Sequence, residues 1–221
     1  MLPWDKIDTV LLDMDGTLLD LHFDNHFWLQ LVPRELSREK GISIDEARAL
    51  VEAQYEQVSG TLNWYCLDYW RDTLGLDVLA LHREMVERIQ MRQDSMPFLQ
   101  ALEQAGKLRI LVTNAHPDNL QLKLEHTELR RGLDKMISSH ETGYPKEHPA
   151  FWTALFEQFE LEPERCLFID DSEHILAAAR KAGVGFQLGI KNPDSQKPHK
   201  AFADFPAIDD YHLLLEELQS Q

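Results

Sequence analysis

Two aspartates separated by a single residue follow a short apolar run near the start of the chain. Asp13 and Asp15 come directly after Val10-Leu11-Leu12 and before Gly16-Thr17. In an extended strand, residues i and i+2 point to the same side, so both carboxylates can face one pocket while Met14 turns away. Two crowded carboxylates repel each other unless a cation or a proton lies between them. The pair therefore favours a functional site over a purely structural role for these two carboxylates.

Polar residues also follow three other segments that have the composition of strands. They are Thr113-Asn114 after 108–112, Lys146 in the loop beyond 135–138, and Asp170-Asp171 after 166–169. A parallel sheet brings the carboxyl ends of its strands to one crevice. Carboxylates gathered there suit Mg²⁺, whereas a hydroxyl, an amide and a lysine suit a phosphoryl group. Any one of these acids alone is typical of an ordinary surface, but their joint placement at successive strand ends predicts a site.

Strand and helix patterns alternate in the second half of the chain, which indicates an α/β fold with a parallel sheet covered by helices on both faces. The expected strands are residues 10–12, 108–112, 135–138, 166–169 and 184–188, and the expected helices are residues 118–126, 150–159, 173–181 and 211–218. The segment 189–205, rich in Pro, Lys and Asp, is expected to be an exposed loop.

The residues between the first strand and the second have a different character, with helical patterns and few strand signals. Ser43-Ile44-Asp45-Glu46 has the form of a capping box before a helix over 47–58, and further helices are expected over 62–74 and 78–89. We expect residues 21–94 to form an inserted helical cap domain, and residues 1–20 plus 95–221 to form the core. Because this insertion leaves from the carboxyl end of the first strand, it would roof the crevice.

Composition excludes several classes of protein. The 221 residues include 22 basic and 38 acidic side chains, a net charge of −16, which disfavours a protein that tracks a nucleic-acid backbone. No apolar run approaches the roughly 20 residues of a membrane span. Two widely separated cysteines and the absence of a signal-peptide pattern favour the reducing cytoplasm. A small phosphorylated metabolite stays compatible with this charge, because a metal and one lysine supply a local positive field.

The four groups of residues resemble, in this order and context, the four motifs of the haloacid dehalogenase-like (HAD) superfamily. These motifs are Asp-x-Asp-Gly-Thr, a Thr or Ser after the second strand, a Lys, and a paired acid. The joint pattern is highly specific, and it implies a Rossmann-like core. The insertion resembles the helical cap of the branch that contains phosphoglycolate phosphatases, β-phosphoglucomutases and many nucleotidases.

The resemblance implies a role for each motif residue. Asp13 matches the nucleophile that becomes an aspartyl-phosphate, and Asp15 matches the acid/base. Thr113 and Asn114 match the phosphate-binding pair, and Lys146 would offset negative charge during transfer.

The resemblance also implies a Mg²⁺ site. Asp171 matches the usual direct ligand and Asp170 its companion, which binds directly or through water, while Asp13 and the main-chain oxygen of Asp15 complete the set. Many relatives carry a second acid four residues after the ligand, where this chain has Ile175. The outer metal shell is therefore less closely matched than the rest.

The cap decides the substrate in this superfamily. Leu62-Asn-Trp-Tyr-Cys-Leu-Asp-Tyr-Trp70 and several core segments resemble the enterobacterial GMP/IMP nucleotidases, which implies hydrolysis of purine 5′-mononucleotides. Trp64 is a candidate for stacking on a purine, although the cap core is the commoner place for the aromatic residues of this segment. Further candidates to face the substrate are Asp24, Asn25 and His116, and plain helix capping is an equal alternative for the first two.

Other activities stay open at this stage. Within the class, a phosphatase of a small phosphorylated acid or sugar is the nearest rival, and a phosphomutase would use the same core. A haloacid dehalogenase needs neither a leaving-group acid nor a metal, so Asp15 and Asp170-Asp171 argue against it. A non-catalytic binding protein is expected to lack a motif residue, and none is missing. The chain is expected to be a monomer or a small homo-oligomer.

Overall fold

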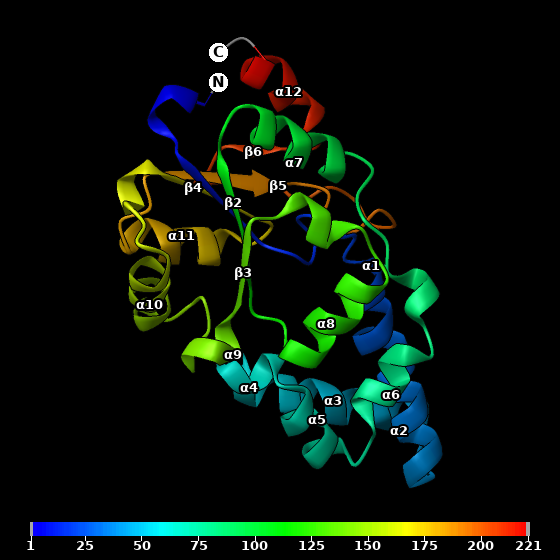
Figure 1. Cartoon of the computed structure of the whole chain (residues 1–221). Coiled ribbons are helices and arrows are strands. Elements are labelled where there is room, and N and C mark those ends of the chain that lie inside the picture. The colour runs from blue at the N-terminus through cyan, green and yellow to red at the C-terminus, as the bar shows by residue number, and fades with distance from the viewer. Residues whose placement is uncertain (1, 220–221) are drawn as a thin grey trace.

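A six-stranded parallel sheet forms the centre of the molecule in a computed structural model that describes residues 2–219 (Figure 1). Its strand order is β3-β2-β1-β4-β5-β6, and every neighbouring pair is parallel. The strands are β1 Thr9–Leu12, β2 Leu108–Thr113, β3 Lys135–Ser138, β4 Cys166–Asp170, β5 Phe186–Ile190 and β6 Ala207–Ile208. The strand order reverses between β1 and β4, which is where open α/β sheets bind ligands.

Helices cover both faces of the sheet, because alternate residues of the buried strands point to opposite sides. Val10 and Leu12 pack with the apolar residues of one set of helices, and Leu11 packs with those of the other. The first set is α7 Ser95–Gln104, α8 Pro117–Glu125 and α12 His212–Gln219, and the second is α10 Pro149–Phe159 and α11 Glu173–Lys181. The predicted α/β architecture is confirmed.

A separate helical unit lies between β1 and β2 in the sequence and beyond one end of the sheet in space (Figure 1). Its elements are α1 His22–His26, η2 Phe27–Leu31, α2 Val32–Lys40, α3 Ile44–Val58, α4 Leu62–Tyr65, α5 Leu67–Leu74, α6 Val78–Arg83 and η3 Val86–Arg88. This unit has its own apolar cluster, to which α8 contributes Leu122. The chain enters and leaves side by side, with the Asp20 N–H donating to the Gln90 carbonyl at 2.9 Å.

Short elements complete the described chain: η1 Trp4–Lys6, η4 Leu129–Gly132, α9 Ser139–Thr142 and η5 Pro163–Arg165. The capping box is confirmed at α3. The Ser43 hydroxyl accepts from the Glu46 N–H at 3.2 Å, and the Glu46 carboxylate accepts from the Ser43 N–H at 2.9 Å.

Several sequence-based boundaries are wrong. The expected helix over residues 62–74 is broken at Cys66, whose backbone is extended at φ −85° and ψ 112°. The break leaves the Trp64 carbonyl free to accept from Trp70 Nε1 at 2.8 Å. The expected helix over 78–89 stops at Arg83, and the loop expected from residue 189 begins inside β5 and contains the buried Asp194. The two-residue strand β6 is too short to leave a pattern.

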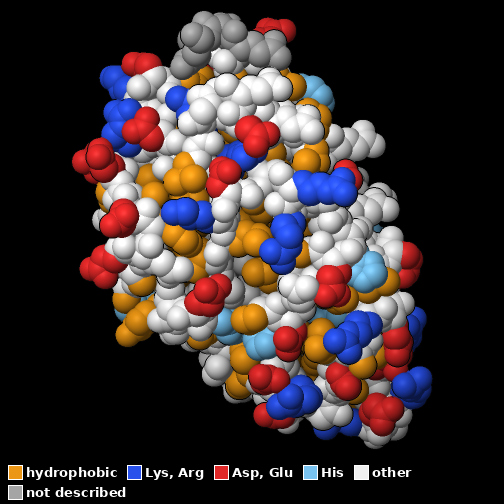
Figure 2. Space-filling model, viewed as in Figure 1, with side chains coloured by type: hydrophobic (Ala, Val, Ile, Leu, Met, Phe, Trp, Pro, Cys, Tyr) orange, Lys and Arg blue, Asp and Glu red, His pale blue; other side chains and the backbone are white. Residues whose placement is uncertain are grey.

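The surface in Figure 2 mixes acidic and basic side chains, most densely over the helical unit at the lower end of the view. The acidic excess is therefore dispersed on this face instead of forming one patch. Within residues 2–219, no helix combines the length and apolarity that crossing a bilayer requires.

Candidate active site

Asp13 lies at the carboxyl end of β1, in the middle of the sheet. Its N–H donates to the Ile169 carbonyl at 3.0 Å, which fixes it against the end of β4. Its buried carboxylate accepts two hydrogen bonds, from Lys146 Nζ at 2.7 Å and from Thr17 Oγ1 at 3.0 Å. The strand end therefore holds one carboxylate in a defined orientation.

Gly16 makes the turn that follows the aspartate pair possible. Its φ is +84°, a left-handed conformation that side chains disfavour. A Cβ atom there would also lie 2.9 Å from Pro193 Cβ and 3.0 Å from Asp171 Cγ. A larger residue would thus push the loop after β1 away from the end of β4.

Lys146 is a buried cation shared by two aspartates. Its Nζ donates to Asp13 Oδ1 at 2.7 Å and to Asp170 Oδ2 at 2.8 Å. Burial alone would lower the pKa of Lys146, but the two carboxylates outweigh burial and raise that pKa, so the ammonium stays charged. Its main chain is held as well, because the Lys146 N–H donates to Asn114 Oδ1 at 2.9 Å and Trp152 Nε1 donates to the Lys146 carbonyl at 2.7 Å.

Three acids gather beside this lysine. Carboxylate oxygens of Asp13, Asp170 and Asp171 lie within 4.8 Å of one another. Burial is the main reason that the pKa values of Asp170 and Asp171 are raised, and the neighbouring carboxylates add to it. Lys200 Nζ contacts Asp171 Oδ2 at 2.5 Å. Such a crowded all-oxygen donor set fits a hard divalent cation, because a cation relieves both the burial and the repulsion.

Thr113 and Asn114 follow β2 directly beside this cluster. The Thr113 hydroxyl accepts from the Ala115 N–H at 3.0 Å, which leaves its own proton available to an anion. The Asn114 side chain is instead used within the protein, since its Nδ2 donates to Glu147 Oε2 at 3.0 Å and its oxygen holds Lys146. Asn114 therefore shapes the lysine loop as well as bordering the pocket.

Asp15 faces the same pocket but pairs with a different lysine. Lys123 of α8 donates to Asp15 Oδ1 at 2.6 Å and to both oxygens of Asp24 at 2.8 and 2.9 Å. Burial and the Asp24 charge raise the pKa of Asp15, while Lys123 opposes them. A raised pKa increases the share of the protonated acid, which is the form that can protonate a leaving group.

A cavity of about 550 Å³ lies over these residues, within the range of roughly 300–1,000 Å³ that is usual for small-molecule sites. Both the core and the helical unit line it. Its lining includes all of the motif residues, Asp13, Asp15, Thr113, Asn114, Lys146, Asp170 and Asp171, and the helical unit adds Asp24, Trp28, Gly60, Trp64 and Tyr65.

Of the four residues expected to face the substrate, two line the cavity and two do not. Asp24 and Trp64 line the cavity. Asn25 lies outside the lining and donates to Asp194 Oδ2 at 2.7 Å, because the loop after β5 offers it a buried carboxylate. His116 also lies outside the lining, and its ring packs against that of His140 with centroids 5.0 Å apart.

Comparison with known proteins agrees with this geometry. Residues 7–183 match the model of a hydrolase family described as haloacid dehalogenase-like hydrolase. The chain belongs to this family. The predicted enzyme class, an HAD-type phosphatase, is confirmed, and the sheet and its covering helices form an HAD-like fold.

Full-length relatives of this HAD hydrolase are known. It is 51% identical to the GMP/IMP nucleotidase YrfG of Escherichia coli over 217 residues, which is 98% of each chain. It is 23% identical to the pyrophosphatase PpaX of Bacillus mycoides, over 81% of each chain. Among solved structures, an HAD phosphatase from Thermococcus onnurineus superposes with a TM-score of 0.79 at 25% identity, covering 96% of this chain and 98% of the other.

Sequence reasoning about this HAD hydrolase missed two charged residues of the site. Lys123 carries a signal that could have revealed it, because it lies three residues after Leu120 on the buried face of α8. Glu147 has a weaker sequence signal, because it is simply the residue after Lys146 in a polar loop. In the structure it accepts from Tyr65 Oη at 2.6 Å. Burial opposes its ionisation, but the surrounding donors prevail and lower the pKa of Glu147 to about 2.

Proposed function

We propose that this protein is a Mg²⁺-dependent phosphomonoesterase that hydrolyses purine 5′-mononucleotides, GMP and IMP, to nucleoside and phosphate. The observation that carries the proposal is the convergence of Lys146 with Asp13 and two further acids, Asp170 and Asp171, beneath a cavity that the helical unit roofs. The 51% identity to a GMP/IMP nucleotidase over nearly the whole chain supports the substrate.

The proposed reaction has two steps. A carboxylate oxygen of Asp13 attacks phosphorus and the bond to the ester oxygen breaks, while Asp15 gives its proton to the departing alkoxide. Asp15 then takes a proton from water, and the resulting hydroxide attacks phosphorus. The bond between phosphorus and Asp13 breaks, which releases phosphate and restores the Asp13 carboxylate.

The charged groups around Asp13 have distinct parts in these steps. Lys146, 2.7 Å from Asp13, offsets negative charge that builds on the carboxylate and the transferring group. The Thr113 hydroxyl donates to a phosphoryl oxygen. Bound Mg²⁺ would be held by Asp13, Asp170 and Asp171 with the main-chain oxygen of Asp15, and it would supply electrostatic stabilisation of the phosphoryl oxygens.

We assign base recognition to a cap of residues 21–94, above a core of residues 1–20 plus 95–221. Trp64 is half-buried and lines the cavity, so one face can receive a purine ring. The cap lines one side of the cavity, where closing over a bound substrate would protect the phosphorylated Asp13 from adventitious reactions.

The decisive experiment replaces the nucleophile. Asp13→Asn should abolish phosphate release from GMP and IMP while leaving the circular dichroism spectrum unchanged. Asp45→Asn is a matched control, because its side chain is 87% exposed and far from the cavity lining. Full activity of Asp13→Asn would refute the mechanism.

A panel of phosphate esters tests the substrate separately. We expect GMP and IMP to be preferred over phosphoglycolate and hexose phosphates, with free phosphate as the product. Preference for a small ester would overturn the nucleotidase assignment alone, and an isomerised sugar phosphate would identify a mutase.

A further inference from the structure

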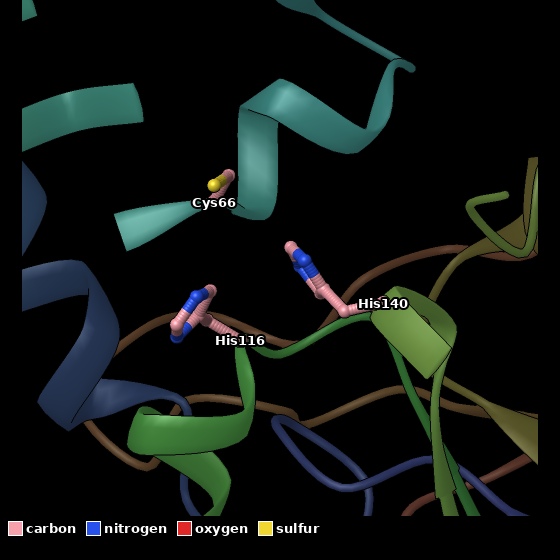
Figure 3. A group of neighbouring side chains, drawn as sticks. All are labelled: Cys66, His116 and His140. Carbon is pink, nitrogen blue, oxygen red and sulfur yellow. The ribbon is translucent and has the colours of Figure 1, made fainter. Parts of the chain in front are cut away.

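A second cluster of ligating side chains lies outside the active site. Cys66, His116 and His140 each offer one ligand atom, and these atoms lie within 4.8 Å of one another. Figure 3 shows the three side chains converging on one space from three separate segments. Cys66 comes from the break between α4 and α5 in the helical unit, His116 precedes α8, and His140 lies in α9.

The donor chemistry of this cluster differs from that of the acidic one. A thiolate and two imidazoles are poor ligands for Mg²⁺, which prefers oxygen, and good ligands for zinc and other borderline transition metals. Three protein ligands and one open position are also a recurrent zinc arrangement. Asp68 Oδ2 lies 3.8 Å from His116 Nε2, outside the group of three ligand atoms.

His140 is poised as a metal ligand. Its Nε2 is buried and makes no hydrogen bond of good geometry within residues 2–219, although the backbone of Asn114 and of Tyr65 lies near the ring. Burial, with a contribution from His116, lowers the pKa of His140 to about 4, so the ring is neutral at physiological pH. A neutral imidazole has the lone pair that a metal requires, and a bound metal would satisfy the unpartnered nitrogen.

His116 has the second contact that metal-binding histidines commonly use. Its Nδ1 lies 3.7 Å from Asp118 Oδ2 and weakly accepts from the Asp118 N–H at 3.3 Å. Binding through Nε2 requires that nitrogen to give up its proton. The ring proton then sits on Nδ1, and the weak bond from the Asp118 N–H is exchanged for one to the Asp118 carboxylate. A carboxylate that holds the far nitrogen fixes the orientation of the ring and strengthens it as a ligand.

We propose that Cys66, His116 and His140 form a site for zinc or a similar transition-metal ion that joins the helical unit to the core. Zinc–sulfur and zinc–nitrogen bonds of about 2.3 and 2.0 Å place tetrahedral ligand atoms roughly 3.5 Å apart. Ligand atoms now up to 4.8 Å apart must therefore move closer, which draws Cys66 towards the core.

The position of the site gives the metal an effect on the cavity. Tyr65 and Leu67, on either side of Cys66, both line it. A metal that ties Cys66 to two core histidines holds this edge of the roof down and slows its opening. Zinc bound there would hold this edge of the cavity at a distance from the Mg²⁺ ligands, and its binding does not depend on which phosphate ester is the substrate.

Cobalt is the most direct probe, because a Co²⁺–thiolate bond gives a charge-transfer band in the near ultraviolet. We expect the full-length protein in saturating Mg²⁺ to develop this band with one equivalent of Co²⁺ and to lose it when Zn²⁺ is added. Cys66→Ser should abolish the band and His140→Ala should weaken or abolish it. His126→Ala, an exposed histidine at the other end of α8, should leave it intact.

Two further measurements keep the test decisive. Asp171→Asn should retain the cobalt band, since the acidic cluster is a separate site. Zn²⁺ should raise the melting temperature of the wild type and of Asp171→Asn but not that of Cys66→Ser, whose unliganded melting temperature also reports whether it folds. Absence of the band in the wild type, or its persistence in Cys66→Ser, would overturn the proposal.

Discussion

Lys123 places a buried positive charge between the aspartate proposed as the acid/base and the helical unit. Its side chain is 1% exposed and contacts Asp15 of the core and Asp24 of α1. Burying an ammonium group is costly unless it is fully paired, and here two carboxylates pair it. Lys123 therefore orients Asp15, and it couples that orientation to the position of α1.

Lys123→Met should lower kcat more than it raises KM, because Asp15 loses the partner that holds it. We expect a loss of about tenfold to hundredfold for GMP, part of the full contribution of a general acid and base. An aryl phosphate needs less help from an acid because its leaving group is stable, so its phosphorylation step should suffer less. Single-turnover kinetics on both substrates measure this difference.

Stability must be followed in the same variant, because removing one partner of a buried ion cluster costs about 3–5 kcal/mol. The double replacement Lys123→Met with Asp24→Asn removes one of the two uncompensated carboxylates and should recover part of the melting temperature without recovering kcat. Equal losses for the nucleotide and the aryl phosphate would show that Lys123 has only a structural role.

At the scale of elements, the break between α4 and α5 gives two neighbouring tryptophans different surroundings. Trp64 is half-buried beside the cavity, whereas Trp70 is fully buried in the aromatic cluster of the helical unit. The Trp70 indole donates to the Trp64 carbonyl at 2.8 Å, so the buried Trp70 ring helps to fix the backbone of Trp64.

Trp64→Leu should weaken hydrolysis of GMP more than that of a small phosphate ester, because only the nucleotide has a base to stack. Loss of one such stack is worth about 0.5–1.5 kcal/mol, or roughly a twofold to tenfold change in KM. Trp70→Leu should instead reduce activity towards both substrates and lower the melting temperature. An equal effect of Trp64→Leu on both esters would place Trp64 in the cap core.

The capping box of α3 gives a prediction about stability alone. Ser43→Ala removes the hydroxyl that accepts from the Glu46 N–H, and the loss of such a cap costs about 1 kcal/mol. The residue is remote from the cavity lining, so kcat and KM should stay unchanged. Urea unfolding measures the first and steady-state assays the second, and a change in KM would show that α3 controls the roof.

Local patterns predicted the elements of the core well and those of the helical unit less well. Buried parallel strands such as β1 and β4 are short apolar runs, and their polar ends are directly visible in the sequence. The break at Cys66 lies beside a contact between distant residues, Tyr65 with Glu147, which periodicity does not record. The same reason explains Lys123, whose partners lie 108 and 99 residues away.

At the scale of the molecule, the core holds two apolar clusters, one on each face of the sheet, and the helical unit holds a third, which includes Leu122 of α8. Charged contacts also join the two units. Lys123 and Glu147 of the core bind Asp24 and Tyr65 of the helical unit directly above the acidic cluster. The whole chain carries a net charge of −16, and three of its acids lie together, two of them buried. The free energy of unfolding should therefore depend on any cation that relieves this repulsion.

Mg²⁺ should raise the melting temperature of the wild type, because the ion binds the folded acidic cluster and not the unfolded chain. At 100 times the dissociation constant the gain is about 2.7 kcal/mol, which corresponds to roughly 5–10 °C for a chain of this size. Chelation should remove both this gain and the release of phosphate. Asp171→Asn should gain nothing from Mg²⁺, because it lacks one carboxylate of the cluster. A parallel measurement in NaCl of the same ionic strength controls for the screening of the net charge by salt. An equal Mg²⁺ shift in both proteins would locate the ion elsewhere.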